Sequence, residues 1–170
     1  MKLLSRLFRT QADPREALRP LWHRVVGIAR EKEWYADMGV ADTLEGRFDM
    51  ITAVLTLVLL RMEREEELIQ PSVFLTELFV EDMDGQLRES GVGDLVVGKH
   101  IGRLVSSLGG RLGAYRAALA EEDDTALEQA VKRNLNLADE SKARLTAAGL
   151  RTLYNRLVYT PGETLLAAGI

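Results

Sequence analysis

Apolar side chains at helical spacing constrain the fold of this 170-residue chain more than any other feature. The most regular stripe lies between residues 97 and 119 and consists of Val97, Ile101, Leu104, Val105, Leu108, Leu112, Tyr115 and Leu119. Residues three and four apart share one face of an α-helix, so this stripe predicts a long amphipathic helix. No stretch shows the sustained period-two alternation of a strand. The pattern therefore predicts an all-α fold.

Signals at the ends of the apolar stripes predict a bundle of about six helices. The first is expected to begin at Pro14, with Asp13 as its cap and Glu16 completing a capping box. The others are expected to open at a second capping box of Asp42 and Glu45, at Pro71, after Asp94, at Asp123 and Asp124, and after Asp139. A short tail is expected after Pro161. The length suits one domain, so we expect a single helical domain over residues 13–170 and a separate arm at 1–12.

Composition excludes several classes of protein. The net charge is −4, whereas nucleic-acid-binding domains are usually basic, so we expect no nucleic-acid partner. The chain has no cysteine, which excludes disulfides and thiolate chemistry, and its two histidines are too few for us to expect a zinc site. The longest uncharged apolar run, from Ile51 to Leu60, is shorter than the ~20 residues of a membrane-spanning helix. We expect it to form the most buried helix of the bundle.

The N-terminal arm is short, basic and amphipathic. Its first residues lack the pattern of a secretory signal or a transit peptide, so we expect a cytoplasmic protein. Apolar and basic residues fall on opposite sides of a helical wheel, which suits the surface of an anionic membrane. The alternative is a frayed end that packs loosely on the body. The candidate membrane-surface residues are Lys2, Leu3, Arg6, Leu7, Phe8 and Arg9.

The stretch from Glu81 to Lys99 departs from the plain amphipathic pattern, because it gathers charges around Gly85, Gly91, Gly93 and Gly98. A shorter stretch of glycine, acid and arginine lies at 39–48. A helical bundle has no folding need for so many charges and glycines between two apolar helices. We therefore expect specific function in these two stretches.

Three ligand-binding patterns occur in the chain, and each is incomplete. Residues 93–99 match the skeleton of a phosphate loop, but His100 follows where Ser or Thr is needed and no strand precedes. The DMDG at 82–85 begins like a calcium loop, yet Gly93 stands where a bidentate Glu is required. His23 and His100 lack a haem attachment motif. No catalytic arrangement can be argued from spacing, so we expect no cofactor, no metal site and no enzyme.

Three segments carry a resemblance to a known family. GVADTLEGRFDMI at 39–51, DMDGQLRESGVGDLVVGKHIGRL at 82–104 and GGRLGAY at 109–115 resemble the ubiquinol–cytochrome c chaperone family over roughly residues 15–160. The family pattern reads roughly GVPDT-x-x-GRF-E-M, DMD-x-x-LRE-x-GVGDL-x-VGK and GR-x-x-AY. This sequence departs from it at Ala41, where the family usually has proline, at Asp49, usually glutamate, and at Val54, where many members have histidine.

The resemblance implies an assembly chaperone that binds newly made cytochrome b and supports assembly of the cytochrome bc1 complex (respiratory complex III). In mitochondria, members of the family work with a small partner protein near the ribosome. The resemblance therefore also implies a small partner protein or the ribosome as further partners. Because no transit peptide is expected, it implies a bacterial protein that works at the inner face of the inner membrane. Two alternatives remain open from the residues themselves: a generic helical interaction module, and a membrane-surface adaptor that uses the arm.

Two interpretations of the motif residues also remain open. In the first, the charged residues tie the second, third and fourth expected helices together, since a buried charge needs a partner. In the second, they line a surface that receives an apolar client segment or a partner helix. The candidate binding residues are Asp42, Gly46, Arg47, Asp82, Asp84, Arg88, Glu89, Gly91, Gly93, Asp94, Lys99, Arg111 and Tyr115.

Overall fold

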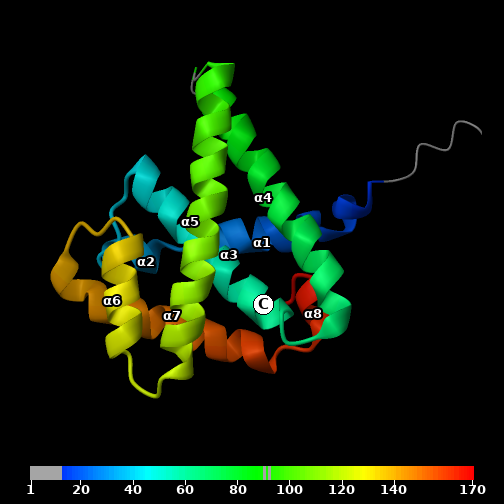
Figure 1. Ribbon diagram of the computed structural model, residues 1–170. Coiled ribbons are helices and arrows are strands. Elements are labelled where there is room, and N and C mark those ends of the chain that lie inside the picture. The colour runs from blue at the N-terminus through cyan, green and yellow to red at the C-terminus, as the bar shows by residue number, and fades with distance from the viewer. Residues whose placement is uncertain (1–12, 90, 92) are drawn as a thin grey trace, which may run out of the picture.

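The fold is known from a computed structural model that describes residues 13–89, 91 and 93–170 (Figure 1). The elements in chain order are η2 (Pro14–Leu18), α1 (Arg19–Ala29), α2 (Lys32–Ala36), α3 (Leu44–Met62), η3 (Glu66–Leu68), α4 (Ile69–Glu89), α5 (Asp94–Ala120), α6 (Thr125–Asn134), η4 (Glu140–Lys142), α7 (Ala143–Tyr159) and α8 (Gly162–Leu166). The predicted all-α class is confirmed. The six expected helices correspond to α1, α3, α4, α5, α6 and α7, while the short helices α2 and α8 are additional.

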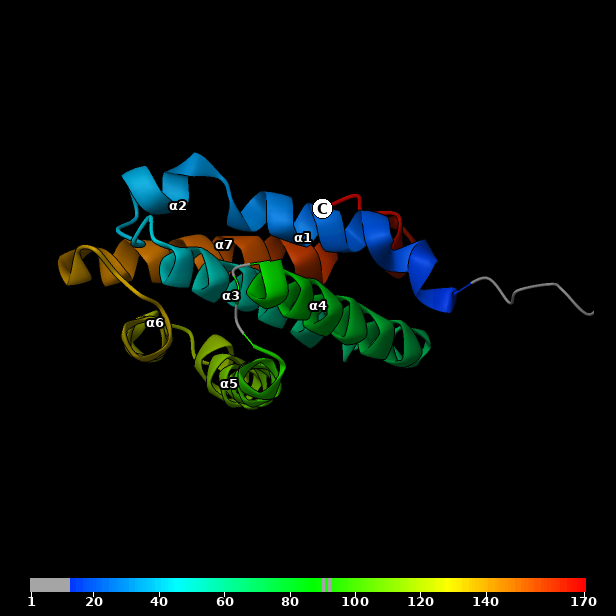
Figure 2. The same cartoon turned by 90° about the horizontal axis from the view of Figure 1, so that it is seen from above.

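Helix α3 is the centre of the bundle. Every residue from Met50 to Met62 is buried, and the helix packs against α1, α4, α5 and α7. A helix that is apolar on all sides is stable only when other helices cover all of it. Figure 2 shows α1 on one side of α3 and α5 on the opposite side. The expectation that the apolar run from Ile51 to Leu60 forms the most buried helix agrees with this arrangement.

Helices α4 and α5 form a long hairpin that rises above the rest of the body in Figure 1. The stretch at 81–99 is therefore mostly helical, with only a short connection between Glu89 and Asp94. Gly85 and Gly98 lie within helices, whereas Gly91 adopts a φ of 82°, a conformation that glycine enters without steric cost. The predicted end of the third helix near Gly91 and Gly93 is confirmed.

Two of the predicted helix starts are corrected. The cap of α3 is Thr43, whose hydroxyl accepts a hydrogen bond from the Gly46 backbone N–H at 3.1 Å, because the Asp42 carboxylate is bound instead to Arg47. Helix α4 begins at Ile69 rather than at Pro71. A proline in the first turn leaves the helix intact, since backbone N–H groups there have no intrahelical acceptor.

The cap of α5 is also different from the expected one. The cap residue is Gly93, and Asp94 is the first residue of the helix. Near the fifth predicted start, Asp123 accepts a hydrogen bond from the Thr125 N–H, and α6 begins at Thr125 as expected. Asp139 likewise accepts one from Ser141 N–H at the start of η4.

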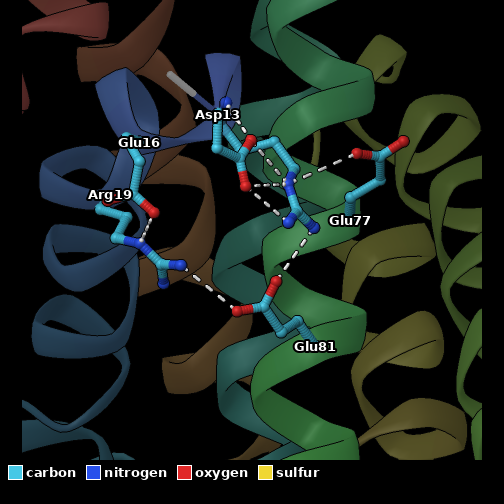
Figure 3. Close-up of polar contacts among 6 residues, drawn as sticks. Asp13, Glu16, Arg19, Glu77 and Glu81 are labelled. Carbon is cyan, nitrogen blue, oxygen red and sulfur yellow. Dashed lines mark hydrogen bonds and ion pairs between the residues drawn. The ribbon is translucent and has the colours of Figure 1, made fainter. Parts of the chain in front are cut away.

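An ion-pair network attaches the start of the described chain to α4 (Figure 3). Asp13 caps η2 by accepting from the Arg15 N–H, and Arg15 reaches Glu81 on α4 at 2.9 Å. The Arg15 side-chain hydrogen bond holds the pKa of Asp13 at about 2. The expected capping box is absent, because Glu16 binds Arg19 at 2.7 Å instead of the backbone of Asp13. Arg19 also reaches Glu81, at 3.3 Å.

Within the described residues, no helix is long and apolar enough to cross a membrane. The candidate membrane-surface residues between Lys2 and Arg9 lie outside the described part of the chain.

Candidate functional site

Arg111 is one of three candidate residues that the structure places inside the fold. It is only 6% exposed and extends from α5 to the carboxylate of Asp49 on α3. The same guanidinium donates to the backbone carbonyl of Asn134 at 2.6 Å, and Asp49 accepts from the Asn136 N–H at 3.1 Å. This pair therefore holds together α3, α5 and the end of α6, whereas the structural interpretation named α4 as the third helix.

Tyr115 lies one turn further along α5 and is fully buried. Its hydroxyl has no hydrogen-bond partner among the described residues, and burial raises its pKa to about 12. A side chain in this position cannot touch a partner on the surface of the folded protein.

Gly46 is the third candidate inside the fold. A Cβ at this position would stand 2.0 Å from the carbonyl oxygen of Ala41, a distance that no side chain tolerates. Only glycine therefore lets α3 approach the preceding loop this closely. We leave Gly46, Arg111 and Tyr115 out of the proposed binding surface.

Asp42 and Arg47, by contrast, lie at the surface. They form an ion pair at 2.7 Å, and both side chains are more than half exposed. They border a hollow of about 630 Å³, called here the Arg47 hollow, whose lining residues are Arg30, Lys32, Tyr35, Ala36, Asp42 and Arg47. Three cations and one carboxylate give this hollow a positive character.

A second hollow of about 680 Å³, the α1–α4 hollow, lies between these two helices. Its lining combines residues of the long motif, among them Asp82, Gly85 and Glu89, with Trp22 and His23 of α1. A Cβ added to Gly85 would meet no atom within 4 Å, so packing does not require glycine there. The glycine instead leaves the α4 backbone accessible on the wall of the hollow.

Arg30 lines both hollows. The two hollows therefore adjoin at Arg30, and together they are called here the Arg30 surface. Its lining brings together Asp42 and Arg47 from the first motif with Asp82 and Glu89 from the second, although the motifs are far apart in the sequence. The structure thus joins two stretches that the sequence analysis could connect only through the family resemblance.

The remaining candidates lie along the hairpin of α4 and α5. Arg88 binds Asp84 at 2.6 Å and Gln86 binds Asp82 at 3.2 Å, in both cases between residues four apart on α4. Lys99 is exposed on α5 and lines a shallow hollow. Of the three helices that the motif charges were expected to tie together, Arg111 joins only α3 and α5, and the bonds described here for Asp82 and Asp84 stay within α4.

Sequence reasoning missed Arg30, Lys32 and His23 as members of the same surface. Lone polar residues on or beside an amphipathic helix give no signal of their own, and none of the three belongs to a motif. Their shared position appears only when α1 is packed beside α4.

Comparison with known proteins agrees with the resemblance seen in the sequence. The model of the family described as "Ubiquinol-cytochrome C chaperone" matches residues 36–170. The crystal structure of the Cbp3 homolog from Brucella abortus is similar to this chain with 32% sequence identity and a TM-score of 0.81, over 99% of this chain and 95% of that one. Among proteins of curated function, none matches this chain. The extent of these matches shows that the chain belongs to the ubiquinol–cytochrome c chaperone family.

Proposed function

We propose that this protein binds newly made cytochrome b and supports assembly of the cytochrome bc1 complex, and that the Arg30 surface contacts the client. One observation carries the proposal: two motifs that resemble those of the family line adjoining hollows that share Arg30. Membership of a chaperone family favours binding over catalysis.

The chemistry of the Arg30 surface supports a polypeptide client. Apolar side chains such as Val26 lie beside charged ones such as Arg19 and Glu89. At protein interfaces, apolar groups supply most of the affinity, while charges at the rim set orientation and exclude wrong partners. Work at the inner face of the membrane, with a small partner protein or the ribosome nearby, is part of the same proposal.

The proposal can be tested in a strain that lacks the gene. Loss of the protein should lower the amount of assembled complex III, and the tagged protein should recover pulse-labelled cytochrome b. Normal complex III in the deletion strain would refute the proposal and favour a generic interaction module. Loss of liposome binding on removal of residues 1–12, with complex III unchanged, would favour the membrane-surface adaptor.

Single substitutions locate the contact surface. Arg47→Ala should reduce recovery of cytochrome b while leaving the melting temperature nearly unchanged, because an exposed ion pair contributes little to stability. Arg64→Ala is the matched control, since Arg64 is an exposed arginine outside the lining of both hollows. Equal recovery by the two variants would remove Arg47 from the contact surface.

A further inference from the structure

Another hollow, the α2–α7 groove, shares no lining residue with the Arg30 surface and has a different chemistry. Its volume is about 560 Å³. It is lined by Ile28, Glu31, Glu33, Trp34, Asp37, Met38, Leu145, Ala148, Gly149, Thr152, Leu153 and Arg156. None of the three segments that carry the family resemblance contains these residues, and the proposed function does not use them.

The groove is held in shape by specific contacts between α2 and α7. A Cβ at Gly149 would come within 2.9 Å of both the Trp34 ring and the Met38 sulfur, so the glycine lets these side chains pack directly on α7. The Trp34 indole N–H donates to the Ile28 carbonyl at 2.9 Å, and the Thr146 hydroxyl donates to the Met38 carbonyl at 2.6 Å. The walls of the groove are therefore formed before any partner arrives.

The lining combines an apolar floor with an acidic rim. Leu145 is a large apolar side chain that is 55% exposed, and it lines the groove together with the apolar side chains of Trp34 and Met38. Three carboxylates, those of Glu31, Glu33 and Asp37, face a single cation, Arg156, on the rim. Neither Glu33 nor Asp37 has an ion-pair partner within the described part of the chain. Two negative charges are thus available to a ligand.

We propose that the α2–α7 groove binds a basic, apolar polypeptide segment, of the kind found where a transmembrane span meets its cytoplasmic flank. Such flanks carry an excess of Lys and Arg next to apolar residues, and that combination is complementary to an apolar floor with an acidic rim. The inference rests on the proposed function, because a nascent membrane protein presents such a segment to a cytoplasmic chaperone. The groove holds the flank, while the Arg30 surface contacts another part of the client.

Fluorescence anisotropy with the full chain and two labelled peptides tests the proposal. Each peptide joins the same apolar helix to a charged end, made of lysines in one and of glutamates in the other. The lysine peptide should bind about tenfold more tightly, and its affinity should fall as salt rises, because the rim charges are exposed. Equal binding of the two peptides would overturn the proposal.

Variants separate the groove from the overall negative charge of the protein. Glu33→Lys combined with Asp37→Lys should lower the affinity for the lysine peptide about tenfold, since two attractive charge interactions become repulsive. The control is Glu121→Lys combined with Glu122→Lys, which makes the same charge change at exposed positions after α5. Equal weakening by the two double variants would show binding to net charge alone and would overturn the proposal.

Leu145→Ala tests the apolar floor and should also lower the affinity for the lysine peptide. Its matched control is Tyr159→Ala, because Tyr159 is 86% exposed on the same helix but lies outside the groove. The melting temperature of each variant verifies that the fold is intact. An unchanged affinity for Leu145→Ala in a folded protein would contradict the assigned floor.

The chain's own basic arm at residues 1–12 is the competing occupant, and removing it provides the test. If peptide affinity rises sharply when residues 1–12 are deleted, the arm occupies the groove and the client assignment is wrong; unchanged affinity supports it. The complex III assay in the deletion strain decides the proposed function separately. Peptide binding that follows the groove variants, together with normal complex III, would refute the proposed function and leave the groove's ligand chemistry standing.

Discussion

Replacing Arg111 with alanine should destabilise the folded protein strongly. The guanidinium is buried and binds the Asp49 carboxylate, the Asp49 carbonyl at 3.2 Å and the Asn134 carbonyl at 2.6 Å. Truncation removes all of these bonds at once. It also leaves the carboxylate of Asp49 without its cation, with a hydrogen bond from the Asn136 N–H as its remaining contact.

The magnitude follows from the burial of the two partners. Removing one member of a buried ion pair costs about 3–5 kcal/mol, chiefly because the other charge stays desolvated. The Asp49 side chain is 25% exposed, so water can reach part of it, and the lower end of that range applies. A loss of about 3 kcal/mol corresponds to a fall of about 6–12 °C in the melting temperature of a chain of this size.

Arg116→Ala is the matched control on the same helix. Arg116 also binds an acid at the end of α3, Glu63 at 2.8 Å, but its side chain is 55% exposed. Exposed pairs contribute about 0–1 kcal/mol, so the melting temperature should fall by less than about 4 °C. Thermal and urea unfolding followed by circular dichroism measure both variants. Equal losses of stability in Arg111→Ala and Arg116→Ala would refute the argument that burial of the ion pair determines how much stability is lost.

Two further predictions concern the packing of the core. Gly46→Ala should destabilise the protein by about 1–3 kcal/mol, because the new Cβ forces α3 away from Ala41, whereas Gly113→Ala should stabilise it by up to about 1 kcal/mol. Urea unfolding measures the change in the free energy of unfolding for each variant. Changes of opposite sign confirm the prediction, and changes of the same sign contradict it. The raised pKa of Tyr115, about 12 against an ordinary value of 10.0, means that the unfolded chain loses this proton first as pH rises. Stability should therefore fall between about pH 10 and 12, and that loss should be smaller in Tyr115→Phe; an identical pH profile would contradict the assignment.

The sequence predicted the helices well and their exact starts less well. Apolar spacing alone identified the helices from α3 to α7, because burial of one face is a property of each segment by itself. The cap of α3 was misassigned because Asp42 and Thr43 are both good capping residues. What decides between them is the position of Arg47, which binds Asp42. That contact depends on folded geometry and leaves no trace in the local pattern.

The sequence indicated which stretches of the chain contribute to the candidate site, but it did not indicate which individual residues line it. The motifs pointed to Arg47 and Asp82, which both line the Arg30 surface. They pointed equally to Tyr115, which is buried, and they gave no indication of Arg30. The apolar stripe of the expected helix did include Tyr115 and so indicated its burial. The position of Arg30 beside the motifs depends instead on the packing of α1, α4 and α5 against α3, which the local sequence pattern does not show.

Folding and binding roles are mixed within a single motif for a physical reason. Gly46 packs against the Ala41 carbonyl and so fixes the loop that leads into α3. Asp42 follows Ala41 in this loop and binds Arg47 at the edge of the Arg47 hollow. The buried glycine therefore positions the exposed ion pair. Gly46 does not line the hollow, but its substitution should displace the loop that shapes the hollow and lower the melting temperature. A substitution at Arg47 should change the hollow directly and leave the fold intact. Melting temperature and client recovery must therefore be measured together.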